Sequence, residues 1–172
     1  MPASTWGEKD GTVTNSERRI SRQRPLVPAP GEARPDWWAL TQVARRMGFG
    51  EAFPYEMPHE IFSEHAALSA FENEPGSPGR RCFHIGALAG LDRDQYDRLQ
   101  PVQWPVTDAA PDGTARLFND RQFFTPDGRA QFLAIQPQSP ARTVSVTDSA
   151  LPWILNTGRL RDQWHTMTRT GR

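Results

Sequence analysis

A change of pattern near residues 105–115 constrains the fold of this 172-residue chain more than any other feature. Before it, apolar side chains recur at the three- and four-residue spacing of amphipathic helices. After it come short apolar runs typical of strands, and Asp127 and Gly128 form a tight-turn dipeptide between two of them. The order predicts a mixed α+β chain in which helices lead and strands follow, without an internal repeat.

Three helices are predicted in the first part of the chain. One begins at Asp36 and closes at Gly48, and a second runs from about Pro58 to Phe71, because proline suits the first turn of a helix. A short third helix follows, with Asp92 as its cap and a stop at Pro101. The side chains expected to form the apolar stripes of these helices are Trp37, Trp38, Leu40, Val43, Ala44, Met47, Ile61, Phe62, His65, Ala66, Leu68, Tyr96 and Leu99.

Loops and strands are expected elsewhere. Residues 6–20 are polar and interrupted by glycine, which predicts a loop whose side chains face something other than a core. Residues 25–35 hold four prolines and one glycine, so they form an extended connector, and residues 73–81 form a further loop. The strands are predicted at residues 116–118, 122–124, 130–135 and 152–156.

Composition excludes several classes of function. Twenty basic residues balance twenty acidic ones, so no net field draws the chain to nucleic acid or to an anionic membrane. No apolar run approaches the roughly 20 residues of a membrane span, and the first residues lack the pattern of a signal peptide. The single cysteine, Cys82, cannot form an internal disulfide or a cysteine-rich metal site. We therefore expect a cytoplasmic protein without nucleic-acid or membrane partners.

The segment from Leu155 to Gly171 carries the densest chemistry. An apolar strand runs into Gly158, where the absence of a Cβ permits close approach of a ligand. Arg159 and Arg161 can bind phosphate oxygens through their guanidinium groups, and the ring of Trp164 offers a planar surface. The residues alone leave two interpretations open: a site for an anion joined to a heterocycle, such as a nucleotide diphosphate, or a solvated loop at the exit of a strand.

This segment resembles the motif that opens the C-terminal domain of the molybdopterin-guanine-dinucleotide oxidoreductases. Residues 8–19, Glu-Lys-Asp-Gly-Thr-Val-Thr-Asn-Ser-Glu-Arg-Arg, resemble another motif of that family, and residues 31–37 and 125–130 match in kind and order. The family includes nitrate reductases and formate dehydrogenases. The compact ending at residues 161–171 is most similar to bacterial assimilatory nitrate reductases, since the formate and periplasmic types tend to carry a glycine after the His-Thr pair.

The resemblance implies the architecture of a fragment. Residues 1–110 would be helices and loops of the α/β domains that cradle the cofactor, and residues 111–172 would be the opening strands of the C-terminal β-barrel domain. A barrel needs its remaining strands to close, and an open edge pairs readily with other chains. We therefore expect an interior piece of a larger enzyme, poorly soluble and inactive by itself.

The resemblance also implies a cofactor and its contacts. The cofactor would be molybdenum-bis(molybdopterin guanine dinucleotide), and a 4Fe-4S cluster with ligands outside this chain would deliver electrons. The intact enzyme would reduce nitrate to nitrite, with an electron-donor protein or domain as partner. The implied cofactor contacts are Lys9, Asp36, Thr157, Gly158, Arg159, Leu160, Arg161, Asp162, Gln163, Trp164, His165 and Thr166; no residue is assigned to catalysis or to metal binding. A formate dehydrogenase-like enzyme and a non-catalytic nucleotide- or partner-binding module are the alternatives.

Several of these residues have a second interpretation. Lys9 is the only lysine among twenty basic residues, and its compact ammonium suits a phosphate contact, although one lysine could also lie there by chance. Asp36 could cap its helix as well as bind a guanine or ribose donor. The charged residues 17–19 are interpreted as structural. The histidines outside the last motif, His59, His65 and His84, are interpreted as surface or packing residues.

Overall fold

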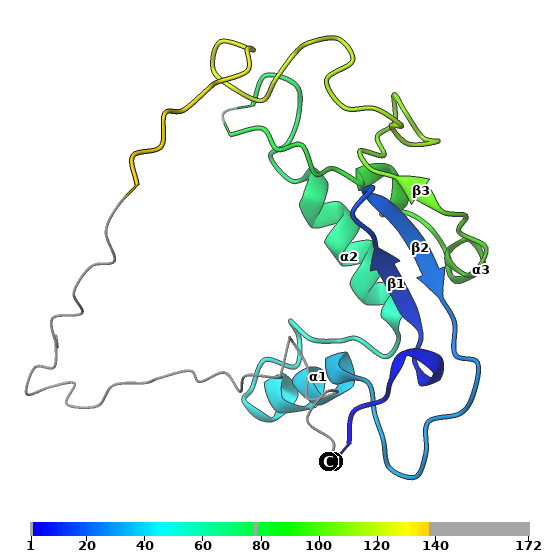
Figure 1. The fold of residues 1–172 in the computed structure, drawn as a ribbon. Coiled ribbons are helices and arrows are strands. Elements are labelled where there is room, and N and C mark those ends of the chain that lie inside the picture. The colour runs from blue at the N-terminus through cyan, green and yellow to red at the C-terminus, as the bar shows by residue number, and fades with distance from the viewer. Residues whose placement is uncertain (1, 78, 138–172) are drawn as a thin grey trace, which may run out of the picture. The chain divides into compact units, whose positions relative to one another are not determined.

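The structure, a computed structural model, describes residues 2–77 and 79–137. The chain divides into two compact units, Met1–Gln131 and Phe132–Arg172, and every element described below belongs to the first. In chain order (Figure 1) these are a 3₁₀ turn Trp6–Glu8, strands β1 (Gly11–Thr14) and β2 (Arg19–Gln23), helices α1 (Asp36–Arg46) and α2 (Pro58–Ala70), a 3₁₀ turn Gly86–Leu88, helix α3 (Arg93–Asp97) and strand β3 (Val102–Gln103). None of the described helices is long and apolar enough to cross a bilayer.

The polar N-terminal stretch forms a β-hairpin, so the prediction of a loop there was wrong. β1 and β2 pair antiparallel, with Gly11 opposite Gln23. In the turn, the side chain of Asn15 accepts two backbone N–H bonds of 2.9 and 3.0 Å, and Arg18 has a φ of 64°. Ile20 is the one buried residue of the two strands. The hairpin escaped prediction because its strands lack the alternating apolar face that marks a half-buried strand.

A third strand attaches the hairpin to a distant part of the sequence. β3 pairs antiparallel with β2, giving the order β1-β2-β3, and Ile20 lies opposite Val102. Beside this pairing, the guanidinium of Arg18 donates to the backbone carbonyls of Trp104, Thr114 and Ala115. The structural interpretation of residues 17–19 is therefore confirmed for Arg18, whose guanidinium joins the hairpin to residues 104–115 by hydrogen bonds to their backbone carbonyls.

The three helices form where their periodicity predicted them. α3 is capped by Asp92, whose carboxylate accepts the N–H of Gln95 at 2.8 Å while the Gln95 side chain accepts the Asp92 N–H at 2.9 Å. α1 begins one residue after Pro35, which occupies the cap position and has no side-chain bond. The capping prediction for Asp36 was wrong, because Asp36 is already inside the first turn, where its charge still interacts favourably with the helix dipole.

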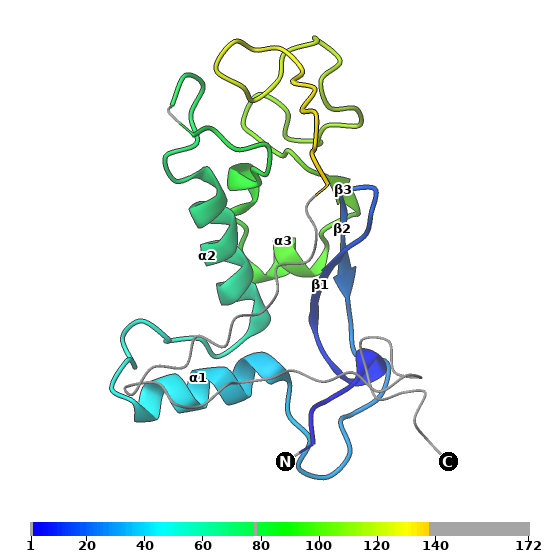
Figure 2. The same cartoon turned by 60° about the vertical axis from the view of Figure 1, so that its left-hand side comes forward.

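The core lies between α2, the sheet and the segment that carries α3. In the turned view of Figure 2, α3 is seen through the opening between α2 and the sheet, and in Figure 1 it lies beyond β2. Tyr96 of α3, 1% exposed, packs against Phe62 of α2 with ring centroids 5.2 Å apart. On α2 the buried positions are Phe62, Ala66 and Ser69, so Leu68 points outward, contrary to prediction. The buried members of the core are Ile20, Phe62, Ala66, Ile85, Leu88, Tyr96, Val102 and Val106.

The apolar stripe of α1 does not face this core. Leu40, Val43 and Met47 are 68%, 56% and 67% exposed, and the buried residue of the helix is Thr41. The prediction that this stripe is core was therefore wrong for these three positions. Periodicity identified the helix, but the described residues provide no surface that covers its apolar side.

Between residues 116 and 135 the predicted strands are absent; the described backbone there consists of turns and irregular segments. A tight turn does form at the predicted dipeptide, with Gly128 at a φ of 69° and its N–H bonded to the Thr125 carbonyl at 3.0 Å. Strands need neighbours to satisfy their backbone groups, and the described chain offers none to this segment. The α+β class is confirmed, while the strand at 152–156 lies outside the described residues.

Candidate functional site

Lys9 and Asp36, the predicted cofactor contacts within the described chain, lie side by side. The Lys9 Nζ is 3.7 Å from an oxygen of the Asp36 carboxylate, and the two side chains are 32% and 70% exposed. A pair this open to water contributes only about 0–1 kcal/mol to stability, so both charges remain available to a ligand. The other ten predicted contacts, Thr157 to Thr166, lie outside the described residues.

Backbone bonds between the first residues and the proline-rich connector bring this pair together. The N–H of Ser4 donates to the Arg34 carbonyl at 3.0 Å, and the N–H of Arg34 donates to the Pro2 carbonyl at 3.2 Å. Lys9 follows the first of these segments by five residues, and Asp36 follows the second by two. Sequence analysis selected both residues through family motifs, but nothing in their spacing indicated that they are neighbours.

A cavity of about 200 Å³ lies beside the pair, since the residues that follow Lys9 and Asp36 both line it. Its walls are mainly apolar and come from α1, α2 and α3, with polar groups at the start of β1. Pockets that bind drug-sized ligands have volumes of about 300–1,000 Å³, so this one suits a single ring. The lining residues are Asp10, Gly11, Thr12, Trp37, Pro58, Ile61, Phe62, His65 and Tyr96.

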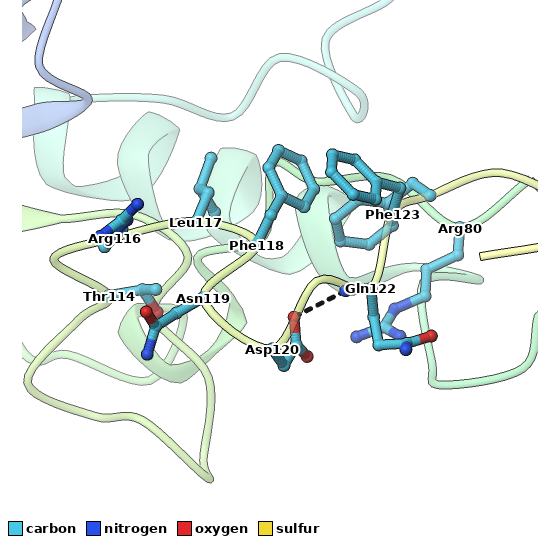
Figure 3. Close-up of a pocket in the computed structure, with 10 residues that line it drawn as sticks. Arg80, Thr114, Arg116, Leu117, Phe118, Asn119, Asp120, Gln122 and Phe123 are labelled. Carbon is cyan, nitrogen blue, oxygen red and sulfur yellow. Dashed lines mark hydrogen bonds between the residues drawn. The ribbon is translucent and has the colours of Figure 1, made fainter. Parts of the chain in front are cut away.

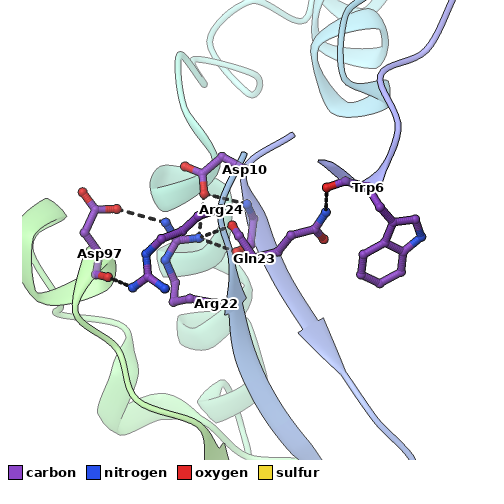
Figure 4. A network of polar contacts seen from close by, with 7 residues as sticks. Trp6, Asp10, Arg22, Gln23, Arg24 and Asp97 are labelled. Atoms are coloured by element: carbon purple, nitrogen blue, oxygen red, sulfur yellow. Dashed lines mark hydrogen bonds and ion pairs between the residues drawn. The ribbon is translucent and has the colours of Figure 1, made fainter. Parts of the chain in front are cut away.

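A buried arginine on β2 fixes the polar edge of that cavity (Figure 4). The Arg22 guanidinium lies 2.7 Å from the Asp10 carboxylate and 3.0 Å from the Asp97 carboxylate, and its side chain is only 2% exposed. It also stacks over the ring of Tyr96 at 4.0 Å. Asp10 in turn accepts the N–H of Gly11 at 2.8 Å. The Asp10 carboxylate, although 37% exposed, is thus held by Arg22 and Gly11, whereas Lys9 and Asp36 are paired with each other through one contact of 3.7 Å.

Burial and charged neighbours act in opposite directions on the pKa values of Arg22 and Tyr96. Burial lowers the pKa of Arg22, but the hydrogen bonds to Asp10 and Asp97 outweigh it, so the pKa lies above the usual value and the group stays charged. Burial also raises the pKa of Tyr96 to about 12 although Arg22 acts to lower it. The Tyr96 hydroxyl and the Arg22 Nε have no hydrogen-bond partner in the described structure. Sequence analysis missed Arg22, because four arginines lie between residues 18 and 24 and no pattern distinguishes the buried one.

The described residues contain a second, larger cavity in the segment that was expected to form strands. It measures about 350 Å³ and lies among loop residues 114–124 together with Arg80 (Figure 3). Phe118 stacks on Phe123 with centroids 4.7 Å apart, and the Arg80 guanidinium lies over Phe124 at 5.0 Å. The only polar bond drawn among its lining residues joins neighbours, from the Gln122 N–H to Asp120 at 3.0 Å. Its cations are Arg80 and Arg116, and neither belongs to a motif singled out in the sequence.

The histidines of the described chain have packing roles, as predicted. His59 lies 2.7 Å from the Leu91 carbonyl, and its ring packs edge-on against Tyr96. The ring of His65 packs against Phe83, with centroids 5.4 Å apart. His84 accepts the N–H of Gly86 at 3.2 Å. These contacts explain all three residues without a ligand.

Metal-ligand chemistry is not evident in residues 2–77 and 79–137, which hold no group of three or more His, Cys, Asp or Glu side chains placed to bind an ion. Burial raises the pKa of the Cys82 thiol, although Arg18 and Arg80 act to lower it. A thiol with a raised pKa is protonated at neutral pH and is therefore a weak nucleophile. Cys82 therefore has a structural environment.

Comparison with known proteins agrees with the motifs. Residues 1–46 match the family model described as molybdopterin oxidoreductase. A nitrate reductase from Klebsiella oxytoca is 53% identical over 99% of the chain, and one from Shewanella frigidimarina is 48% identical over 99%. The alpha subunit of F420-dependent formate dehydrogenase 2 from Methanococcus maripaludis is 34% identical over the whole chain.

The chain is much shorter than these relatives. It spans 18% of the length of each of the two nitrate reductases and 22% of the formate dehydrogenase subunit. The alignments run through nearly every residue, so the similarity extends well beyond the N-terminal segment that matches the family model. By these alignments and by the match of its first 46 residues, the chain is similar to the molybdopterin oxidoreductases over nearly its whole length.

Proposed function

We propose that this chain forms part of the cofactor-binding wall of a molybdenum oxidoreductase that reduces nitrate to nitrite. The single observation that carries the proposal is the solvent-accessible pair of Lys9 and Asp36 beside a mostly apolar cavity. The 53% identity to a nitrate reductase supports nitrate as the substrate. The full activity depends on polypeptide beyond these 172 residues, because the chain spans only about a fifth of such relatives.

The residues present fit a guanine dinucleotide. The Lys9 ammonium can exchange its 3.7 Å contact with Asp36 for a phosphate oxygen. The Asp36 carboxylate can then accept hydrogen bonds from a guanine edge or a ribose hydroxyl. The cavity lined by Trp37 has room for one ring and presents apolar walls to it. A cation, an acceptor and an apolar surface are the three kinds of group that such a ligand requires.

The terminal segment would complete the contacts. Under this proposal Arg159 and Arg161 bind the pyrophosphate, and the remaining residues of 157–166 surround the pterin. In the whole enzyme a bis(molybdopterin guanine dinucleotide) molybdenum centre would supply the redox chemistry of nitrate reduction, and a 4Fe-4S cluster would supply the electrons. The one cysteine of this chain cannot hold that cluster, so its ligands belong to the rest of the enzyme.

The proposal includes a compartment and a partner. A single cysteine agrees with a reducing environment, so we place the enzyme in the cytoplasm. An electron-donor protein or domain would reduce the cluster. This chain would contribute binding and orientation of the cofactor, through charged side chains just before β1 and at the start of α1.

A chimera tests this function directly. The chain replaces the aligned segment of the Klebsiella oxytoca nitrate reductase, and the purified protein is assayed for molybdenum, for guanine nucleotide released by acid, and for nitrite formation. We expect metal and nucleotide contents close to those of the parent enzyme, with nitrate reduced. A folded chimera that holds neither molybdenum nor guanine nucleotide would contradict the proposal and favour a non-catalytic module.

Formate oxidation is the second candidate. It is favoured by the alignment with an F420-dependent formate dehydrogenase subunit over the whole chain, at 34% identity. The same chimera separates the candidates poorly, because its remaining sequence comes from a nitrate reductase. The natural gene surrounding this chain, expressed whole and offered nitrate and formate in parallel, decides between them by which substrate is turned over.

A further inference from the structure

We infer that the exposed apolar face of α1, formed by Leu40, Val43 and Met47, is the surface on which the remainder of the enzyme's own polypeptide packs. The inference rests on the proposed function in one respect, that the chain works as a segment of a larger molybdopterin oxidoreductase. It concerns how this segment is held in that enzyme, a question separate from whether it contacts the cofactor.

The face is continuous and begins at the candidate site. Asp36, Leu40, Val43 and Met47 are separated by four, three and four residues, the spacing that places side chains on one side of a helix. Phe49 continues the apolar surface beyond the end of α1, where its N–H donates to the Ala44 carbonyl at 3.0 Å. The surface is therefore charged at the end that meets Lys9 and apolar along the rest.

Other sides of α1, not this apolar face, contact the described chain: Thr41 is 2% exposed, and Arg45 bonds to the loop that follows the helix. The Arg45 guanidinium donates to the carbonyls of Phe53 and Tyr55 at 2.9 and 3.0 Å and pairs with Glu56 at 2.8 Å. By helical spacing Arg45 points away from the side that carries Leu40 and Met47. The helix is thus tethered on one side while large apolar side chains on another remain exposed, as expected of a surface made for a partner.

The lengths of the relatives support this choice of occupant. The Klebsiella oxytoca nitrate reductase aligns with 99% of this chain, yet the aligned part is only 18% of that protein, so more than four-fifths of a related polypeptide is available to cover the face. Residues 37–44 carry no charged side chain, which suits an apolar protein surface. A cofactor that contacts Lys9 and Asp36 also needs walls on its open sides, and the same helix face leads away from that position.

The rate of methionine oxidation tests whether this face is covered in the larger protein, because it depends on the solvent exposure of Met47. Met47 is compared in the isolated chain and in the Klebsiella chimera after brief treatment with hydrogen peroxide, and mass spectrometry reads its sulfoxide with the half-buried Met57 as reference. Because oxidation follows exposure, we expect Met47 to react about tenfold more slowly in the chimera. Equal and fast oxidation in both proteins would overturn the inference. Slow oxidation in both, with the isolated chain a dimer in sedimentation, would assign the face to a second copy and also overturn it.

Paired substitutions give an independent measure. Leu40→Asp with Val43→Asp should lower the thermal midpoint of the chimera by several degrees while leaving that of the isolated chain unchanged, because these side chains are already exposed there. Gln42→Asp, on the same helix but off this face, is the matched control and should change neither midpoint. An equal loss in both proteins, or no loss in the chimera, would contradict the inference.

The two proposals fail separately. A chimera that protects Met47 but binds no molybdenum would sink the proposed function and leave the α1 surface assigned to the enzyme's own polypeptide. A chimera that contains molybdenum but in which peroxide still oxidises Met47 rapidly would support the proposed function and overturn the assignment of the α1 surface.

Discussion

Helices α1 and α2 are of similar length, but only α2 buries its apolar face within the described chain. α2 directs Phe62 and Ala66 into a core shared with Tyr96 and the sheet. α1 leaves Leu40 and Met47 in solvent, while it buries Thr41 and bonds through Arg45 to the loop that follows it. The half built around α2 and the sheet, the complete half, is therefore packed internally. The half with α1 and the Lys9–Asp36 pair, the open half, presents an apolar surface that has no cover among residues 2–77 and 79–137, and residues of both halves line the cavity beside the pair.

The cations of the two halves differ in the same way. Arg22 is buried and paired with two carboxylates, so its charge is neutralised within the protein and is not accessible to a ligand. Lys9 makes one long contact with an exposed carboxylate, so its charge is available. Substitutions in the complete half should therefore change stability, and substitutions in the open half should change binding.

The largest effect on stability is expected from Phe62→Ala. Its ring is 5% exposed and packs on Tyr96, and removal of such a ring typically costs about 3–5 kcal/mol. Leu40→Ala on α1 is the matched substitution and should change the free energy of unfolding by less than about 0.5 kcal/mol. Urea denaturation of the two variants checks the contrast; similar losses would show that α1 is packed after all.

Arg22→Met should cause the second-largest loss of stability. Removing one partner of a buried ion pair typically costs about 3–5 kcal/mol, and because Asp10 and Asp97 remain 37% and 49% exposed, the lower end is expected. Arg46→Met, at an exposed position of α1, serves as the control. A loss for Arg22→Met no larger than that of the control in urea denaturation would show that the network does not stabilise the fold.

The local signals in the sequence were sufficient for the helices. The periodicity of α2, its first proline and the cap at Asp92 all act within a few residues, so they could be predicted. The hairpin could not, because it lacks apolar alternation and because Ile20 finds its partner Val102 more than eighty residues later. The strands predicted between 116 and 135 are absent although the sequence there has apolar runs. Apolar runs alone do not form a strand, because a strand also needs a neighbouring strand to pair with.

The site was predictable only in part. Family motifs selected Lys9 and Asp36, yet their 3.7 Å contact depends on the Ser4 and Arg34 backbone bonds, which no motif encodes. The cavity beside them draws on several elements, so its existence depends on tertiary packing. Arg22 was missed because burial, not residue type, distinguishes it from its neighbouring arginines.

Tyr96, in the complete half, is expected to make the stability of the fold depend on pH. Its pKa in the folded protein is about 12, above the ordinary value of 10.0, so the neutral phenol is favoured by folding. The stability that this provides is complete below pH 10 and is lost as the pH rises toward 12. Tyr96→Phe removes both the titration and a buried hydroxyl without a partner, so we expect equal or higher stability at about pH 8 and a smaller decline between pH 10 and 12. An identical decline in both proteins would contradict the assignment.

The smallest effect on stability is expected at the candidate site. Lys9→Met and Asp36→Asn each break the exposed pair, which should change the free energy of unfolding by less than about 0.5 kcal/mol. Denaturation of the isolated chain checks this. A loss as large as that of Arg22→Met would mean that the pair is part of the internal structure and is not held open for a ligand.

Cofactor retention in the Lys9→Met chimera decides whether the open half binds the dinucleotide. The chimera with the unaltered chain, Lys9→Met and the control Arg46→Met are dialysed side by side, and guanine nucleotide and molybdenum are measured per protein molecule. A charge-assisted bond to phosphate contributes about 1.5–3 kcal/mol, so we predict roughly a tenfold or larger weakening of retention for Lys9→Met and none for Arg46→Met. Equal retention in all three proteins, with Lys9→Met still folded, would contradict the assignment of this pair to the cofactor.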